Sequence, residues 1–314
     1  MTAPEAAAHH FSRRRFLAGS LAALALGGCA TSSGERPGII DTHTHFYDPT
    51  RPEGVPWPPK DDALLHRPVL PDEFKQLVAP FGVVGTVVVE ASPRIDDNDW
   101  LLDLADSDPF IRGIVGHLKP GQPDFQEQLQ RLANHPRFKG IRTGLWGVPV
   151  QTNSADIIRD LRRLGERDLA LDVLVGPDQL PLVAQLAGHV PTTRLVVDHC
   201  ANVRVRERSD RWTEGIQSAA QQPNVYMKVS GLVEGSGRPP APVDLNFYRL
   251  VLDTIWDAFG EDRIIYGSNW PVSARFASYE QVLRIVYDYF KAKGYSAVRK
   301  YFWANATDVY RLEG

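Results

Sequence analysis

The 314-residue sequence has no excess of charge of one sign, almost no cysteine and no long apolar run after residue 28. Its 35 basic and 38 acidic residues are interspersed. The one basic cluster, at 204–208, is broken by Glu207, and we interpret it as a solvated loop. The balanced charge and the lack of an unbroken basic cluster argue against nucleic acid as a partner. No Gly-x-Gly-x-x-Gly follows the first predicted strand, so the dinucleotide-binding fingerprint is also missing.

The N-terminus has the pattern of an export signal. Residues 12–17 read Ser-Arg-Arg-Arg-Phe-Leu and precede an apolar, small-residue stretch over 18–28. That stretch is about half of the ~20 residues that a bilayer span needs, so we interpret it as a signal of the twin-arginine type. A single uncleaved anchor helix is the alternative. Both interpretations place the protein outside the cytoplasm.

The residues that follow resemble a lipidation site. Leu-Gly-Gly-Cys at 26–29 is similar to the lipobox of a bacterial lipoprotein, in which the cysteine is acylated and begins the mature chain. We therefore predict a signal peptide over 1–28, a lipid anchor at Cys29 that holds the protein to the periplasmic side of a membrane, and a flexible tether over 29–37. If Cys29 carries lipid, Cys200 has no partner, and no intrachain disulfide can form.

After the tether, β-rich apolar runs alternate with segments of helical period. This alternation is typical of a parallel sheet built from βα units. We expect strands at 38–43, 84–90, 111–117, 138–142, 169–175, 194–199, 224–230 and 263–268. We expect helices near 72–80, 98–106, 124–134, 154–166, 178–188, 209–221, 245–260 and 278–292.

Eight strands with eight helices predict a (β/α)8 TIM barrel in one domain, 38–314. A doubly wound open sheet is the competing architecture, but the strand count suits closure better, and the Gly-rich turn is missing. Residues 46–71 carry seven prolines. We expect this long first βα loop to cover the mouth of the barrel.

Active-site residues of such barrels lie at the carboxyl ends of strands, and this chain has polar residues there. Asp41, His43 and His45 share one face of the first strand, because side chains alternate along a strand. The other predicted strand ends carry Glu90, His117, Arg142, Asp198-His199, Lys228, Ser230 and Ser268-Asn269. Four of the seven histidines after residue 28 end a strand, and packing alone explains this poorly.

Three of these positions also have plain structural interpretations. His117 faces either the mouth or the surface, because its register is not determined. Lys228 must be paired or neutral if it points inward, and we favour an ion pair near the site over a Schiff base. Cys200 follows His199 and is expected to be a small apolar filler.

Five motifs together resemble the amidohydrolase superfamily, and most closely its amidohydrolase 2 branch of sugar-lactone and pyrone-dicarboxylate lactonases. They are Ile-Asp-Thr-His-Thr-His-Phe at 40–46, Phe-Lys-Gly-Ile-Arg at 138–142, Val-Val-Asp-His at 196–199, Asn-Val-Tyr-Met-Lys-Val-Ser-Gly-Leu at 224–232 and Tyr-Gly-Ser-Asn-Trp-Pro-Val at 266–272. The resemblance covers nearly all of 38–312.

The resemblance implies a histidine cluster around a hydrolytic water, with or without one divalent metal ion such as zinc. The implied catalytic residues and metal ligands are His43, His45 and His199. Arg142 is implied as a clamp for a carboxylate or hydroxyl of the substrate. His117, Lys228 and Trp270 are further candidate substrate-binding residues.

The last motif departs from the family pattern. The lactonases have Ser-Asp-Trp-Pro where this chain has Ser268-Asn269-Trp270-Pro271. An amide has no useful basicity, and general-base catalysis is worth about 10²–10⁴ in rate. Either Asn269 positions water or substrate while Glu90 or His199 acts as the base, or the chemistry has changed, or the protein only binds its ligand.

We therefore expect an exported, lipid-anchored hydrolase that opens a small cyclic ester by attack of water, with sugar-acid lactones favoured over aromatic-derived ones. Decarboxylation or C–N hydrolysis on the same scaffold is the enzymatic alternative. A non-catalytic ligand-binding lipoprotein is the alternative from another class. The partners are then a small molecule and a membrane, and the oligomeric state stays open.

Overall fold

The computed structural model describes residues 38–144 and 154–313. The predicted signal peptide, the lipobox with Cys29 and the tether lie outside these residues. Contacts group residues 37–314 into one compact unit. Within the described ranges, no helix is both long and apolar enough to cross a membrane.

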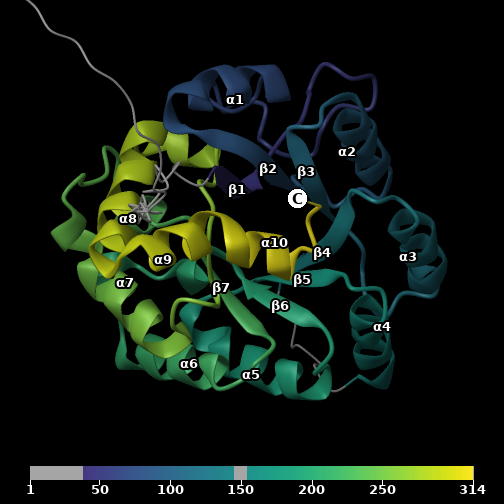
Figure 1. Ribbon diagram of the computed structural model, residues 1–314. Helices are drawn as coiled ribbons and strands as arrows, with labels where there is room; N and C mark the ends of the chain where they lie inside the picture. Colours follow the sequence, from purple (N-terminus) through teal and green to yellow (C-terminus); the bar gives the residue numbers. More distant parts are fainter. Residues whose placement is uncertain (1–37, 145–153, 314) are drawn as a thin grey trace, which may run out of the picture. The chain divides into compact units, whose positions relative to one another are not determined.

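Eight parallel strands form one sheet in sequence order, as predicted (Figure 1). They are β1 (Ile39–Thr44), β2 (Val83–Val89), β3 (Ile111–Gly116), β4 (Phe138–Gly144), β5 (Ala170–Leu174), β6 (Arg194–Val197), β7 (Val225–Val229) and β8 (Ile264–Tyr266). The residues after β8 join the sheet to β1: Asn269 N donates to His43 O at 2.9 Å, and His45 N donates to Trp270 O at 2.9 Å. The sheet thus closes into the predicted (β/α)8 barrel.

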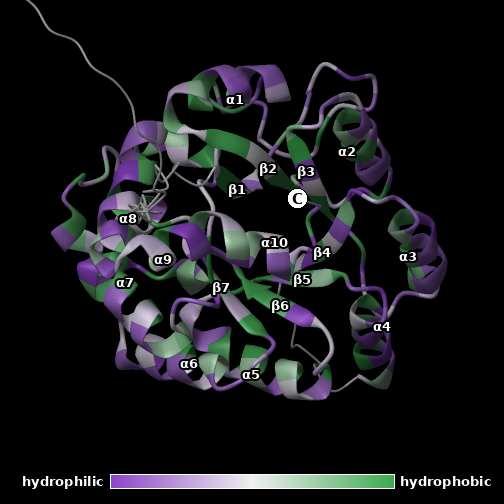
Figure 2. Ribbon diagram, viewed as in Figure 1, coloured by the Kyte–Doolittle hydropathy of each residue, from purple (hydrophilic) through white to green (hydrophobic). Residues whose placement is uncertain are grey.

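Helices surround the strands (Figure 1). They are α1 (Pro71–Val78), α2 (Asp96–Ser107), α3 (Phe125–Ala133), α4 (Ala155–Gly165), α5 (Leu180–His189), α6 (Asp210–Ala220), α7 (Leu245–Phe259) and α8 (Tyr279–Lys293). Local sequence sets their starts: Ser278 and Gln281 form a capping box at α8, and Asp244 caps α7. Figure 2 shows hydrophobic residues along β6 and β7 and hydrophilic ones on much of α3 and α4. The core therefore lies between strands and helices.

The chain after α8 closes the amino end of the barrel, a feature that the sequence analysis did not anticipate. It comprises α9 (Tyr295–Arg299), a π-helical turn, η7 (Lys300–Ala304), and α10 (Asn305–Val309). Asn305 donates to the carbonyl of Ile264, the first residue of β8, and Arg194, the first residue of β6, donates to Val309 O. Tyr310 and Leu312 pack on inward-facing side chains of the barrel. The opposite, carboxyl end is left for a site.

The loop between β1 and α1 contributes to that carboxyl end. Tyr47 and Val69 pair across the loop through two backbone hydrogen bonds of 3.0 and 2.9 Å. The Trp57 ring lies edge-on to the ring of His45, with their centroids 5.9 Å apart. The proline-rich loop thus places an aromatic side chain beside the first-strand histidines.

Candidate active site

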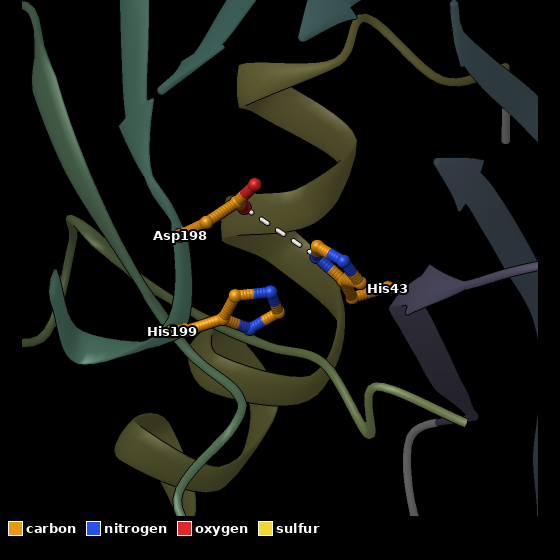
Figure 3. A group of neighbouring side chains, drawn as sticks. All are labelled: His43, Asp198 and His199. Atoms are coloured by element: carbon orange, nitrogen blue, oxygen red, sulfur yellow. Dashed lines mark ion pairs between the residues drawn. The ribbon is translucent and has the colours of Figure 1, made fainter. Parts of the chain in front are cut away.

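The three predicted histidines meet at the carboxyl end of the barrel. The ring centroid of His43 lies 4.4 Å from that of His199 and 5.0 Å from that of His45. All three side chains are buried, and His43 and His199 point toward one another from β1 and from the end of β6 (Figure 3). The alternation of β1 brings His43 and His45 to one side, and barrel closure brings His199 to them.

A left-handed turn presents His199. The strand predicted at 194–199 is shorter in the structure: β6 ends at Val197, and residues 198–202 form a short 3-10 element. His199, Cys200, Ala201 and Asn202 all have φ between 51° and 55°. Non-glycine residues in this region cost of order 1 kcal/mol or more each, and such strain clusters at functional sites.

Contacts from the end of β7 hold the His199 ring. Its Nδ1 lies 2.9 Å from Ser230 Oγ. Gly231 has a φ of +59°, and a Cβ built there would lie 2.8 Å from His199 Cβ, so only glycine fits. The Ser230-Gly231 pair after β7 thus both supports the ring and makes room for it.

Asp198 joins two of the histidines in a group that suits a metal ion. One potential ligand atom each from His43, Asp198 and His199 lies within 4.8 Å of the others (Figure 3). His43 Nδ1 is 3.4 Å from Asp198 Oδ1, and His43 Nε2 has no hydrogen-bond partner within 38–144 and 154–313. The group differs from the predicted trio in one member, because Asp198 stands where His45 was expected. His45 Nδ1 instead lies 2.9 Å from Val89 O, which turns its ring toward the cavity described below.

Lys228 neutralises the acids in the barrel interior. Its Nζ lies 2.5 Å from Asp172 Oδ2 and 3.1 Å from Asp198 Oδ1, and Tyr310 donates to Asp172 at 2.9 Å. Burial opposes ionisation of Asp198, but the charge of Lys228 and the contact with His43 outweigh it and hold the pKa of Asp198 well below its usual range. Burial raises the pKa of Asp172 to about 6. Lys228 is therefore an ion-paired residue of the interior, as the sequence analysis favoured.

The same burial keeps the imidazoles neutral. It lowers the pKa of His199 to about 4 and that of His45 to about 3, and it lowers the pKa of His43 well below its usual value. Neutral rings can bind a metal or accept a proton from water, whereas imidazolium ions can do neither.

A cavity of about 810 Å³ opens over the histidines. Its walls come from the loops that follow most of the strands. Of the predicted site residues, His45, Arg142, His199 and Asn269 line it. Further lining side chains that bear on the chemistry are Trp57, Arg204, Glu234 and Phe276.

The remaining predicted residues lie outside this lining. Trp270 packs in an aromatic cluster with Phe46 and Phe74, at centroid distances of 6.3 and 5.1 Å, so its placement does not support contact with substrate. His117 is held through its backbone by Asn98, which accepts from His117 N at 2.8 Å, and its ring does not reach the cavity wall. The structure places neither Trp270 nor His117 in the lining of this cavity, and their role in substrate binding stays a prediction.

Glu90 is engaged by Arg142. Arg142 Nε donates to Glu90 Oε1 at 2.9 Å, and Arg142 Nη2 donates to Glu90 O at 2.7 Å. Glu90 does not line the cavity, whereas Arg142 does. Glu90 thus orients the guanidinium, and its carboxylate is not free to take a proton from a water in the cavity.

The sequence pattern of an amidohydrolase family matches residues 40–312. The chain belongs to this amidohydrolase family. It is 34% identical over 237 residues to an L-fucono-1,5-lactonase of Burkholderia ambifaria, covering 74% of this chain and 80% of the relative. It is 30% identical over 275 residues to an L-fucono-1,5-lactonase of Burkholderia multivorans, covering 84% of this chain and 92% of the relative.

The fold agrees with a solved amidohydrolase as well. A crystal structure of an amidohydrolase from Burkholderia multivorans with bound zinc superimposes with a TM-score of 0.80 at 29% sequence identity. The alignment covers 88% of this chain and 100% of that chain. The barrel is thus shared with that solved member of the family.

Sequence reasoning missed two polar residues of this amidohydrolase cavity. Glu234 lies in the loop after β7, five residues past the strand end, and Oε1 of its carboxylate accepts from Asn269 Nδ2 at 2.8 Å. Arg204 comes from the cluster at 204–208 that was interpreted as a solvated loop; it is exposed, yet it lines the cavity. Neither residue has a periodic signal, and only the proximity of Glu234 to a strand end hints at its place.

Proposed function

We propose that this amidohydrolase hydrolyses a small cyclic ester, and that its substrate is the lactone of a sugar acid. The observation that carries the proposal is the cavity over neutral histidines, with Arg142 in its wall. A volume of about 810 Å³ accommodates a hexose-sized lactone with water. The two relatives named L-fucono-1,5-lactonase support a sugar-acid lactone over an aromatic-derived one.

The residues present can carry out the steps of ester opening. His199 is anchored through Nδ1 to Ser230, so its Nε2 can hold a water by a hydrogen bond when no metal ion occupies the site. Attack of that water on the lactone carbonyl places negative charge on the carbonyl oxygen. The guanidinium of Arg142, fixed by Glu90, offers N–H donors to this oxygen or to a substrate hydroxyl.

We also propose that a divalent ion such as zinc binds at this site. His43, Asp198 and His199 would hold it. Among residues 38–144 and 154–313, His43 Nε2 and both Asp198 oxygens lack a hydrogen bond, although Lys228 Nζ forms an ion pair with Asp198 Oδ1, and these atoms together with the neutral imidazoles fit that donor set. When bound, such an ion lowers the pKa of a coordinated water and polarises a carbonyl. The solved Burkholderia multivorans amidohydrolase with bound zinc supports this assignment.

We further propose that the enzyme works on the periplasmic side, anchored by lipid at Cys29. The support is the sequence alone: consecutive arginines at 13–15, a short apolar stretch and the lipobox.

The test is a screen of purified protein against sugar-acid lactones, an aromatic-derived lactone, amides and carboxylates, followed with a pH indicator. We expect hydrolysis of at least one sugar-acid lactone, with turnover lowered at least about 10²-fold by His199→Ala. His189→Ala is the matched control, because His189 is exposed on α5 and outside the cavity. A wild-type protein that binds a lactone without opening it would contradict the proposal and favour a ligand-binding lipoprotein.

A further inference from the structure

The turn after β8 holds an amide, Asn269, where a hydrolase of this kind needs a proton acceptor, and a carboxylate lies against that amide. Asn269 has a φ of +59°, a conformation that asparagine tolerates well, and its backbone N–H donates to His43 O at 2.9 Å. The turn thus directs the Asn269 side chain into the cavity wall. There its Nδ2 donates to Glu234 Oε1 at 2.8 Å.

The second oxygen of Glu234 is unsatisfied. Oε2 is buried and has no hydrogen-bond partner among residues 38–144 and 154–313. A buried polar atom without a hydrogen-bond partner destabilises the fold by about 1–3 kcal/mol, and by more when it is charged. A carboxylate in this position therefore needs a hydrogen-bond donor. Glu234 lines the same cavity as His45, His199, Arg142 and Asn269, and a water or a substrate hydroxyl there can supply that donor.

We infer that Glu234 is the general base of this amidohydrolase, with Asn269 as the residue that positions it. The inference rests on the lactonase function proposed above. The carboxylate removes one proton from water as the water oxygen bonds to the lactone carbonyl carbon. The ring C–O bond then breaks, and the proton passes from Glu234 to the departing ring oxygen. The product is the open hydroxy acid, and Glu234 returns to its ionised form.

The other candidate bases are less suited. Glu90 is paired with Arg142 and lies outside the cavity wall. His199 belongs to the proposed metal group, and its Nδ1 is engaged by Ser230 Oγ at 2.9 Å. His45 Nδ1 is engaged by Val89 O at 2.9 Å. Burial raises the pKa of Glu234 to about 7, which suits a base that works near neutral pH.

The surroundings of Glu234 explain why residue 269 is an amide. Arg204 and His199 share its cavity, and Tyr248 and Cys200 are its other titratable neighbours. The contact with residue 269 is the only hydrogen bond to the Glu234 carboxylate from another side chain of the described chain. A second carboxylate at 269 would face the first at this distance, and the two could not both be ionised. The base thus lies in the loop after β7 rather than in the turn after β8.

The first experiment compares Glu234→Gln with Glu207→Gln, an exposed glutamate outside the cavity, on the lactone found in the screen. We expect Glu234→Gln to lower kcat about 10²–10⁴-fold with KM within about threefold, because the isosteric amide keeps the contact with Asn269. In wild type, kcat/KM should rise with pH through about 7, as Glu234 loses its proton, and this limb should vanish in Glu234→Gln. Glu207→Gln should match wild type.

Relocating the carboxylate is the second experiment. Asn269→Asp alone should lower turnover, because two acids then share one site. The double variant Glu234→Gln with Asn269→Asp should recover at least about tenfold over Glu234→Gln alone. If Glu234→Gln melts well below wild type, rescue of Glu234→Ala by added formate provides the same information, since formate replaces the lost carboxylate.

The outcomes separate the two proposals. A wild-type protein that opens no lactone overturns both the proposed function and the role of Glu234. The role of Glu234 alone is overturned if wild type is active and Glu234→Gln keeps both its turnover and the rise of kcat/KM with pH. It is also overturned if the activity of wild type falls above pH 7. Absence of rescue in both the double variant and the formate experiment also overturns it.

Discussion

Lys228 Nζ lies 3.1 Å from Asp198 Oδ1 in the barrel interior. The same ammonium contacts Asp172, so one cation serves two buried carboxylates, and one of these belongs to the candidate metal group. The stability of the barrel and the chemistry at its mouth therefore share a residue. The positive charge of Lys228 beneath the histidines keeps Asp198 ionised, so that its carboxylate can serve as a metal ligand.

Replacing Lys228 by methionine should destabilise the fold by about 3–5 kcal/mol, because two buried carboxylates then lose their cation. The measurement is urea unfolding at pH 7.5. Lys291→Met, an exposed lysine of α8, is the control and should shift the midpoint little. Adding Asp172→Asn to Lys228→Met should recover part of the loss, because one uncompensated charge is removed. A Lys228→Met protein as stable as wild type would show that the ion pairs contribute nothing.

Metal content should depend on the group around His43. We expect purified protein to bind about one equivalent of zinc after chelator treatment and reloading, and His43→Gln or Asp198→Asn to lose it, because each change removes a ligand. Plasma mass spectrometry of the dialysed proteins measures this. His117→Gln, at a half-buried histidine outside the group, should bind as wild type does. If wild type takes up no divalent ion, the metal assignment is wrong, and hydrolysis proceeds on the side chains alone.

Acid should weaken the fold through His199. Its pKa of about 4 in the folded protein lies below the ordinary value of 6.5, so between these pH values the unfolded chain binds more protons. Stability then rises with pH across this window and is lost as pH falls. In metal-free protein, wild type should lose about 2–3 kcal/mol more than His199→Gln between pH 7.5 and 4.5.

Denaturant midpoints of both proteins at the two pH values provide the comparison. His189→Gln, at an exposed position of α5, should behave as wild type. Equal losses of unfolding free energy in wild type and His199→Gln would mean that His199 has the same pKa in the folded and the unfolded state.

Export should depend on the arginine pair and lipidation on the cysteine. Changing Arg13 and Arg14 to lysine should leave the protein in the cytoplasm, because the twin-arginine route recognises the pair. Cys29→Ser should be exported without lipid and released into the soluble fraction. Cell fractionation with metabolic labelling by a fatty acid measures both, with Cys200→Ser as the control that keeps its label. Membrane-bound, labelled Cys29→Ser protein would contradict the lipobox.

The local sequence pattern was sufficient to predict the barrel and the end of it at which the histidines lie. Alternation along β1 puts His43 and His45 on one side whatever surrounds them, and eight repeated strand-helix units leave closure as the favoured arrangement. Because parallel strands end at one edge, polar residues at strand ends such as His199 and Arg142 could be assigned to a common mouth.

Only the tertiary structure decided which of these side chains act together. The left-handed turn at 198–202 directs His199 and Asp198 differently from a continued strand. Glu90, at a strand end, accepts a hydrogen bond from Arg142. Glu234, in a loop without periodicity, accepts one from Asn269. Loops and turns owe their course to long-range packing rather than to a repeating local preference. The sequence by itself therefore determined the scaffold and the histidine pair, and the partner of each carboxylate depended on contacts between residues far apart in the chain.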